Sequence, residues 1–254
     1  MLKAEHLTCG YGGEPVVKDL SFEVPSGGRL CILGPNGCGK TTLLRALAGL
    51  LPHEGSVSVA GRDLASMSRR QAAQSVALLS QISSVYFSYS VYETVLMGRY
   101  AHQAGGAFAG PGPEDKRIAL ECMERTGVAH LRHRQVTELS GGQLQRVFLA
   151  RTFAQCPQVI LLDEPTNHLD LKYQVELVQE LKEWAAGEGR CVVGVLHDVN
   201  LALDLADLFL FMEEGRAQYF GPAAEFDPAA LNRVYQMDVG GYMRRSLTRW
   251  EELK

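Results

Sequence analysis

Residues 34–42 read Gly-Pro-Asn-Gly-Cys-Gly-Lys-Thr-Thr, and they constrain the fold more than any other part of this 254-residue chain. An apolar run precedes them at 29–33, and a run with helical spacing follows at 42–48. The fixed places of the pattern G-x-x-x-x-G-K-[ST] are filled by Gly34, Gly39, Lys40 and Thr41. Glycines let successive backbone N–H groups converge on one phosphate chain, and the start of a helix adds the positive end of its dipole. The sequence therefore predicts an α/β fold in which a strand, a phosphate-binding loop and a helix follow one another.

The side chains of this loop suit a nucleotide with a magnesium ion. Lys40 can place a full charge on the β- and γ-phosphates, and the Thr41 hydroxyl can bind Mg²⁺. The predicted nucleotide contacts in this stretch are Gly34, Pro35, Asn36, Gly37, Cys38, Gly39, Lys40, Thr41 and Thr42. A glycine-rich turn that happens to precede a helix is the alternative, and the complete pattern in its strand-loop-helix setting disfavours it.

Polar residues stand directly after three apolar runs that read as buried strands. Gln81 follows 76–80, Asp163 and Glu164 follow 159–162, and His197 follows 190–196. Open α/β sheets bind ligands at the carboxyl ends of their strands, so these side chains are candidates for one site. Beside a phosphate loop, Asp163 can hold Mg²⁺ through water, and Glu164 can polarise an attacking water. Gln81 can bind Mg²⁺ or orient water, and His197 can contact the γ-phosphate. Surface acids, a solvated glutamine and a structural histidine are the alternatives.

Two further places carry both a functional and a purely structural interpretation. The ring of Tyr11 can stack on a nucleobase, or it can cap the edge of a sheet. Ser140 and Gln143 have the spacing of a capping box at the start of a helix. Gly141 and Gly142 in the first turn each cost about 1 kcal/mol relative to alanine, which makes sense if bare backbone must approach a phosphate. A poor helix start is the alternative.

Composition excludes several classes of protein. The chain is 46% hydrophobic and 21% charged, which is ordinary for a globular protein, and its net charge of −4 gives no basis for binding nucleic acid. The six cysteines are scattered and include no C-x-x-C pair, so we expect reduced thiols. The N-terminus lacks the apolar core of a signal peptide, and Asp204 and Asp207 interrupt the most apolar long stretch, 199–212. Any membrane association is therefore expected to come through a partner.

Cys38 is the one cysteine for which we expect a special property. It lies close to Lys40 and to the start of a helix, and such surroundings favour the thiolate. Fast alkylation with protection by ATP is the hypothesis, and a packed, inert thiol is the alternative.

The order of the patterns predicts a single domain with parts. Residues 1–81 and 157–221 form an α/β core that includes an N-terminal β subdomain, 82–156 form a helical subdomain, and 222–254 form a C-terminal tail. The expected inward-facing side chains are Ile118, Cys122, Met123 and Thr126 in a helix over 114–126, and Val175, Val178, Leu181 and Trp184 in a helix over 172–186. The stretch 101–113 is expected to be a mobile loop. The tail is expected to hold one helix, 228–236, before a weakly patterned end.

Taken together, these residues resemble the ATP-binding subunit of an ABC transporter over about 2–221. The resemblance makes 34–42 the Walker A loop, Gln81 the Q-loop glutamine, and 139–143 the signature motif. It also makes 159–163 Walker B, Glu164 the catalytic glutamate, 167–170 the D-loop, His197 the switch histidine, and Tyr11 the aromatic that stacks on adenine. The implied fold is a P-loop NTPase core with a mixed sheet, an N-terminal antiparallel β subdomain and an inserted helical subdomain.

The resemblance also implies the ligands, ATP and Mg²⁺, and a role for each residue. Catalysis falls to Glu164, His197, Gln81 and Lys40, and Mg²⁺ to Thr41, Gln81 and Asp163. Beyond the Walker A loop, the implied nucleotide contacts are Tyr11, Ser140, Gly141, Gly142, Gln143, Asp163 and Asp170. A second copy is expected to bind head to tail, with Ser140 and the Gly142 backbone reaching the γ-phosphate of its partner's ATP.

A finer resemblance lies in the stretches 97–102, 166–170 and 197–202, which look like those of importers for ferric siderophores, haem and cobalamin. Such importers imply integral membrane permease subunits, indirectly a substrate-binding protein, and a peripheral place on the cytoplasmic face of the inner membrane. The alternatives are the ATPase of another ABC importer and a soluble, non-transport ABC ATPase. The second is disfavoured by the single cassette, the absence of a heptad run and the negative net charge. Because Glu164 and His197 are both present, a purely structural binding module is disfavoured as well.

Overall fold

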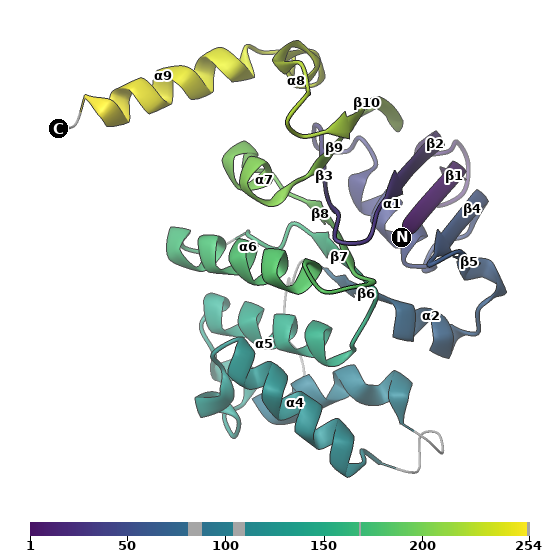
Figure 1. The fold of residues 1–254 in the computed structure, drawn as a ribbon, viewed down its shortest axis with the longest axis vertical. Coiled ribbons are helices and arrows are strands. Elements are labelled where there is room, and N and C mark those ends of the chain that lie inside the picture. The colour runs from purple at the N-terminus through teal and green to yellow at the C-terminus, as the bar shows by residue number, and fades with distance from the viewer. Residues whose placement is uncertain (81–87, 104–109, 168, 253–254) are drawn as a thin grey trace.

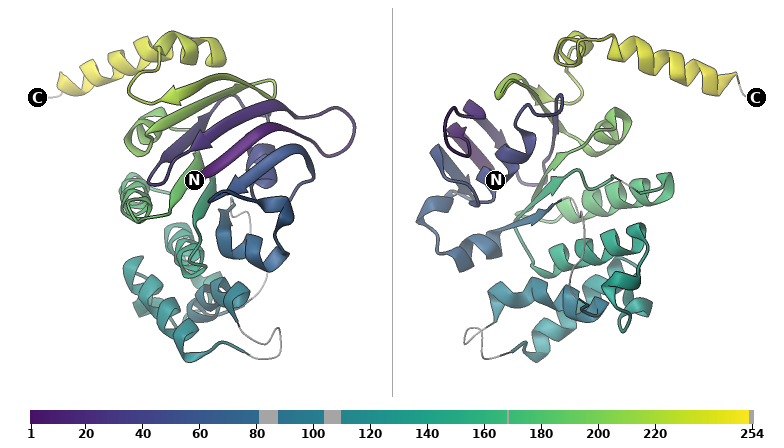
Figure 2. Two further views of the ribbon diagram at one scale, coloured as in Figure 1. Left: turned by 45° about the vertical axis from the view of Figure 1, so that its right-hand side comes forward. Right: turned by 180° about the vertical axis from the view of Figure 1, so that it is seen from behind.

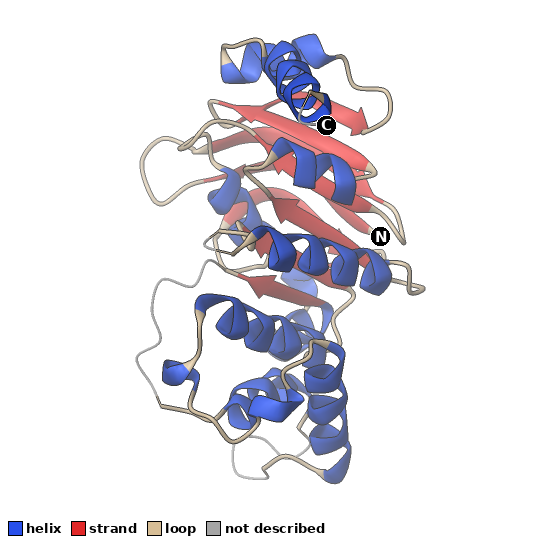
Figure 3. Cartoon of the chain, turned by 90° about the vertical axis from the view of Figure 1, so that its left-hand side faces the viewer, coloured by secondary structure: helices blue, strands red, loops and turns tan. Residues whose placement is uncertain are grey.

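The computed structural model describes residues 1–80, 88–103, 110–167 and 169–252 (Figure 1). Figure 3 shows that the molecule has two parts, one that contains the strands and one that is made of helices alone. Gln81 lies outside the described residues, and so does much of the predicted loop 101–113.

The N-terminal sheet is antiparallel, as the resemblance implied. Its strands are β1 (Leu2–Cys9), β2 (Val17–Val24), β4 (His53–Val59) and β5 (Arg62–Asp63), in the order β2-β1-β4-β5. In β2, buried Leu20, Phe22 and Val24 alternate with exposed residues, which is the period-two pattern of a strand with one covered face. This face packs with the helix α1 (Lys40–Leu47) and the second sheet around one apolar core.

The second sheet contains the strands whose carboxyl ends carry the predicted site residues. Its strands are β3 (Arg29–Leu33), β6 (Val76–Leu79), β7 (Val159–Asp163), β8 (Cys191–Val195), β9 (Leu208–Glu213) and β10 (Arg216–Pro222). The order is β10-β9-β3-β8-β7-β6, and every pairing is parallel except that of β10 with β9. Each residue of β7 and β8 is buried, because this sheet is covered on both faces (Figure 2). The carboxyl ends of β3, β7 and β8 therefore open onto one edge.

Helices cover the other face of this sheet. They are α6 (Leu171–Ala185), α7 (Val199–Leu205) and α8 (Pro228–Tyr235), and they share a second apolar core with the sheet. The predicted inward position of Val175 is wrong, because its side chain is 50% exposed. The buried stripe of α6 instead runs through Leu177, Val178, Leu181, Trp184 and Ala185.

The helical part has its own apolar core. Its main elements are α3 (Val91–Leu96), α4 (Pro113–Arg125) and α5 (Gly141–Ala154), with 3₁₀ turns at Met97–His102, Ala129–Leu131 and Val136–Glu138. A short helix, α2 (Arg69–Ser75), leads into β6. The predicted buried face of α4 is rotated slightly: Asp115, Ala119 and Met123 are buried, whereas Ile118 and Cys122 are only half-buried. The reason is that Asp115 turns inward to pair with a buried arginine.

The tail holds two helices where the sequence predicted one. α9 (Val239–Glu251) follows α8 and projects from the body of the molecule (Figure 1). It buries only Val239 and Gly241 and leaves Leu247 and Trp250 exposed. Its apolar residues nevertheless recur at helical spacing, so the end that was expected to be weakly patterned does carry the signal of an amphipathic helix. Within the described residues, no helix is long and apolar enough to cross a membrane.

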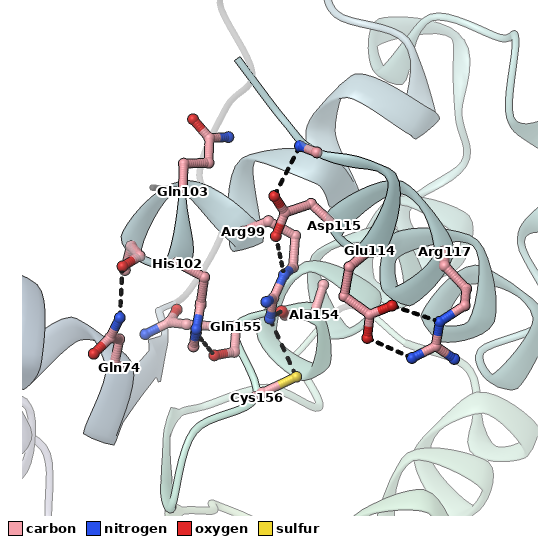
Figure 4. Close-up of polar contacts among 12 residues, drawn as sticks. Gln74, Arg99, His102, Gln103, Glu114, Asp115, Arg117, Ala154, Gln155 and Cys156 are labelled. Carbon is pink, nitrogen blue, oxygen red and sulfur yellow. Dashed lines mark hydrogen bonds and ion pairs between the residues drawn. The ribbon is translucent and has the colours of Figure 1, made fainter. Parts of the chain in front are cut away.

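A buried ion pair ties the helical part together (Figure 4). Arg99 Nε donates to Asp115 Oδ1 over 3.0 Å, and Arg99 Nη1 donates to the Ala154 carbonyl over 2.7 Å. Asp115 Oδ2 accepts from the Gly112 backbone at the start of α4. Arg99 is 6% exposed and Asp115 9% exposed, so each buried charge depends on the other for its compensation.

We predict that Arg99→Met lowers the free energy of unfolding by about 3 kcal/mol, because it strands a buried carboxylate. Arg117→Met is the matched control, since Arg117 pairs with Glu114 and Glu121 on the exposed face of the neighbouring helix α4. Urea unfolding of the two variants measures the difference. Equal midpoints for both would contradict a structural role for the buried pair.

Candidate functional site

The phosphate loop spans 34–39 between β3 and α1, as predicted. A Cβ atom added to Gly34 would lie 2.2 Å from the Met212 carbonyl oxygen, so only glycine fits there. Gly37 and Gly39 have positive φ angles of 80° and 106°, which curl the loop over the start of α1. The sequence adopts this turn because glycine occupies each position where a side chain is forbidden or strained.

Lys40 lies inside this loop rather than in solvent. Its side chain is 6% exposed, and its ammonium group donates to the carbonyl oxygens of Gly34 (2.7 Å) and Pro35 (2.8 Å). A pocket of about 300 Å³ opens beside it. The pocket is lined by Val16, Asn36, Gly37, Gly39, Lys40, Thr41, Thr42, Glu164 and His197. The structure therefore brings six of the nine predicted loop residues together with two of the predicted strand-end residues, whereas Gly34, Pro35 and Cys38 do not line the pocket.

Thr41 and Asp163 meet at the floor of the site. The Thr41 hydroxyl donates to Asp163 Oδ1 over 3.0 Å. Burial raises the pKa of Asp163, and the hydrogen bond from Thr41 offsets part of that rise. These two oxygens suit Mg²⁺, which takes one or two protein oxygens and completes its shell with phosphate and water. In the described ranges, no group of three or more His, Cys, Asp or Glu side chains forms a metal site of the kind that needs protein ligands alone.

Glu164 is fixed from three sides. Its backbone adopts a positive φ of 53°, and its N–H donates to the Val195 carbonyl at the end of β8. His197 Nε2 lies 2.6 Å from Glu164 Oε1, and Asn167 Nδ2 donates to Glu164 Oε2 over 2.7 Å. A left-handed conformation at a non-glycine residue is strained, and such strain often accompanies function. The carboxylate is thus aimed and held at the wall of the phosphate pocket, where it can accept a proton from water.

The other predicted contacts lie away from this pocket. Ser140 and Gln143 form the predicted capping box, in which Gln143 N donates to Ser140 Oγ and Ser140 N donates to Gln143 Oε1. Asp170 caps α6 by accepting from the Tyr173 backbone. Tyr11 is 59% exposed, and its hydroxyl accepts from Arg45 Nη1 over 2.9 Å. None of these residues, nor Gly141 or Gly142, lines the phosphate pocket of its own chain.

Sequence reasoning did not name Val16 as a site residue, and it placed Asn167 in the D-loop without its contact to Glu164. Val16, just before β2, forms part of the pocket wall, and no polar signal marked it. Asn167 donates a hydrogen bond to the carboxylate of Glu164, the candidate catalytic residue. Its place three residues after Glu164, in a tight loop, is the signal that could have identified it.

Cys38 does not fit the thiolate hypothesis. Its side chain is 6% exposed, and burial raises the pKa of its thiol, while the Lys40 charge only partly opposes the rise. A Cβ added to Gly34 would lie 2.9 Å from its sulfur, so the thiol is packed beneath the loop. The structure thus favours the packed, inert alternative.

Comparisons with known proteins agree with this geometry. The sequence profile described as ABC transporter matches residues 17–167. The ABC transporter ATP-binding protein YvrA of Bacillus subtilis (strain 168) is 41% identical over 250 residues, which cover 96% of this chain and 56% of YvrA, so the chain spans little more than half of that relative. The iron(3+)-hydroxamate import ATP-binding protein FhuC of the same strain is 37% identical, with 94% of this chain and 88% of FhuC covered. The hemin import ATP-binding protein HmuV of Gloeobacter violaceus is 42% identical, with 87% of this chain and 82% of HmuV covered.

Two solved structures have a similar fold. An inward-facing metal-chelate type ABC transporter gives a TM-score of 0.79 at 32% identity, covering 92% of this chain and 88% of that chain. The dimeric, post-hydrolysis state of the ATP-binding cassette MJ0796, bound to ADP and Pi, gives a TM-score of 0.77 at 26% identity, covering 89% of this chain and all of that one (100%).

We predict that iodoacetamide alkylates Cys38 at least about tenfold more slowly than Cys156 in the native protein, because only a thiolate reacts and Cys38 is buried. Cys156 is exposed, and Arg99 Nη1 donates to its sulfur. A mass-spectrometric time course measures both rates, and denaturation should bring them together. Faster labelling of Cys38, with protection by ATP, would restore the thiolate hypothesis.

Proposed function

The chain belongs to the ABC transporter family, and we propose that it is the ATP-hydrolysing subunit of an importer for an iron siderophore, haem or cobalamin. The observation that carries the hydrolytic role is the carboxylate of Glu164, held by His197 and Asn167 at the wall of the pocket that contains Lys40. Its chemistry is the attack of water on the γ-phosphate of ATP.

The phosphate loop and Lys40 bind the phosphates of ATP. Lys40 exchanges its two loop carbonyl acceptors for phosphate oxygens, so its charge is already in place when the nucleotide arrives. Thr41 and Asp163, with Gln81, would hold Mg²⁺, which would neutralise charge on the phosphates. Tyr11, steadied by Arg45, stacks on the adenine.

Glu164 polarises the attacking water. Because His197 and Asn167 hold both of its oxygens, the carboxylate loses little freedom when the water is positioned, and Glu164 lines the pocket where that water would stand. His197 also lines the pocket and contacts the γ-phosphate. As the water oxygen bonds to the γ-phosphorus and the bond to ADP breaks, the Glu164 carboxylate accepts the proton of the water, and the phosphate product later takes it away.

The site is completed by a second copy of the chain. Ser140, Gly141, Gly142 and Gln143 stand outside the chain's own phosphate pocket, so they serve ATP only across a head-to-tail interface. The dimeric state of MJ0796 supports this arrangement. An interface built on the γ-phosphate lasts only until hydrolysis, and this provides the switch that drives transport.

The partners in the membrane are permease subunits, which a substrate-binding protein supplies with cargo. The names of FhuC and HmuV and the metal-chelate type of the similar transporter support this class of importer. The chain then works as a peripheral subunit on the cytoplasmic face of the inner membrane.

We predict that Glu164→Gln lowers the rate of ATP hydrolysis by roughly 10²–10⁴-fold, because the general base is lost while the shape of the site is kept. ATP should still bind, and a dimer should accumulate in size-exclusion chromatography with light scattering. Glu188→Gln, on an exposed loop after α6, is the control and should leave both properties unchanged. Near-normal turnover in Glu164→Gln would remove Glu164 as the base.

We predict that the tagged chain, purified from detergent-solubilised native membranes, retains a many-helix permease that mass spectrometry identifies. In liposomes that contain this complex, a substrate-binding protein loaded with a ferric siderophore, haem or cobalamin should raise the ATPase rate above that with the unloaded protein. Recovery of ribosomal proteins or DNA-binding proteins instead of a permease would favour the soluble, non-transport alternative.

A further inference from the structure

The first turn of α5 lies directly on an aromatic ring. A Cβ added to Gly142 would lie 2.9 Å from Cδ2 and 3.1 Å from Cε2 of Tyr173, which belongs to the first turn of α6. The glycine therefore allows one side of the ring to touch the backbone of the turn. This contact gives Gly142 a role within its own chain, apart from any approach to a phosphate.

Tyr173 is itself held in place from α5. The Arg146 guanidinium lies over the ring, 4.4 Å from its centroid, and pairs with Glu176 one turn along α6. Gly142 and Arg146 are four residues apart on α5, and Tyr173 and Glu176 are three apart on α6. Each pair therefore lies on one face of its helix, and the two contacts between the helices are one turn apart.

The same turn of α6 is fastened to the loop that follows Glu164. Tyr173 N donates to Asp170 Oδ1 over 3.0 Å, and Gln174 Nε2 donates to the carbonyl oxygens of Thr166 and Leu169. The loop begins at Asn167 with its hydrogen bond to Glu164. A continuous path of short contacts thus runs from the catalytic carboxylate to the turn at 140–142.

The ring is not part of an apolar core. Tyr173 is half-buried and does not belong to the buried clusters, and a cavity of about 330 Å³ opens beside it between α5 and α6. Without the ring, the turn at 140–142 gains space on the side of that cavity. In the described part of the chain, the Tyr173 hydroxyl has no hydrogen-bond partner, so the contact depends on the ring alone.

We propose that Tyr173 is a positioning residue, whose ring sets where Ser140 and Gly142 stand relative to Glu164. The inference rests on the proposed function, because it assigns the turn to the ATP of a second copy. Its effect is therefore on the closed dimer, and not on the first binding of ATP to the phosphate loop.

The test compares Tyr173→Ala, Tyr173→Leu and Tyr173→Phe in the full chain. Alanine and leucine should lower kcat by about tenfold or more and reduce the ATP-dependent dimer in the Glu164→Gln background, since a small displacement of a catalytic group is costly. The affinity of the monomer for ATP should change by less than about twofold, because Tyr173 does not line the phosphate pocket. Phenylalanine should restore kcat and dimerisation. Val175→Ala, on the exposed side of the same helix, is the matched control.

A double-mutant cycle with Gly142→Ala tests the contact without any nucleotide. In the presence of Tyr173, the added Cβ clashes with the ring and should lower the thermal midpoint. In Tyr173→Ala the same substitution should raise the midpoint, because alanine favours a helix over glycine. This reversal of sign is the expected result.

Wild-type kcat and dimerisation in Tyr173→Ala, or additive effects in the cycle, would overturn the inference. Failure of phenylalanine to restore activity would also overturn it, because the ring would then not be the determinant. A Glu164→Gln protein that stays monomeric with ATP would count against the proposed function, and the nucleotide-free cycle would still decide whether Tyr173 fixes the turn.

Discussion

The parallel pairing of β7 with β8 is the interaction on which the site depends. It sets Leu162 opposite Gly194 and Asp163 opposite Val195, and the ladder ends with the bond from Glu164 N to the Val195 carbonyl. With β8 paired to β3, the phosphate loop, the two acids and His197 leave the sheet at one edge. The distances in the pocket therefore follow from the register of the sheet.

Much of this arrangement could be predicted, since it depends on local signals. Glycines at 34, 37 and 39 encode the loop, and a polar residue after an apolar run marks a strand end. Orientation within helices was harder to predict: Val175 and Leu177 are both apolar, and only packing shows which faces the core. The fate of Cys38 depends on burial beneath the loop, which sequence neighbours such as Lys40 do not reveal. α9 could have been predicted as well, because Val239, Tyr242, Met243, Leu247 and Trp250 recur at helical spacing, although the structure buries little of that stripe.

The acidic side chains of the site, Asp163 and Glu164, cost free energy of folding that apolar side chains at the same positions would not cost. Burial raises the pKa of Asp163, and Glu164 stands beside it with a strained backbone. Such features persist only where the surrounding structure holds them, and here the sheet and the 166–170 loop do so. A ligand that binds only the folded site would stabilise this arrangement, so ligand binding and local order are coupled.

The helix α5 connects the two halves of the protein, and its packing explains why contacts at its start matter. It contributes Leu149 and Phe153 to the core shared with the central sheet, and Val147, Ala150 and Ala154 to the helical core. A helix that is apolar on two sides is recognised poorly by periodicity, but it transmits rotation well, because neither core lets it slide. Its C-terminal end is held by Gln155, which donates to the Ala73 and Val76 carbonyls, and its start rests on α6. A movement of the helical part relative to α6 would carry the turn at 140–142 with it, and it must therefore break the contacts between the start of α5 and α6. At the start of α5 these contacts are the Tyr173 ring against Gly142 and the ion pair of Arg146 with Glu176. Such contacts can break and re-form without exposing an apolar core.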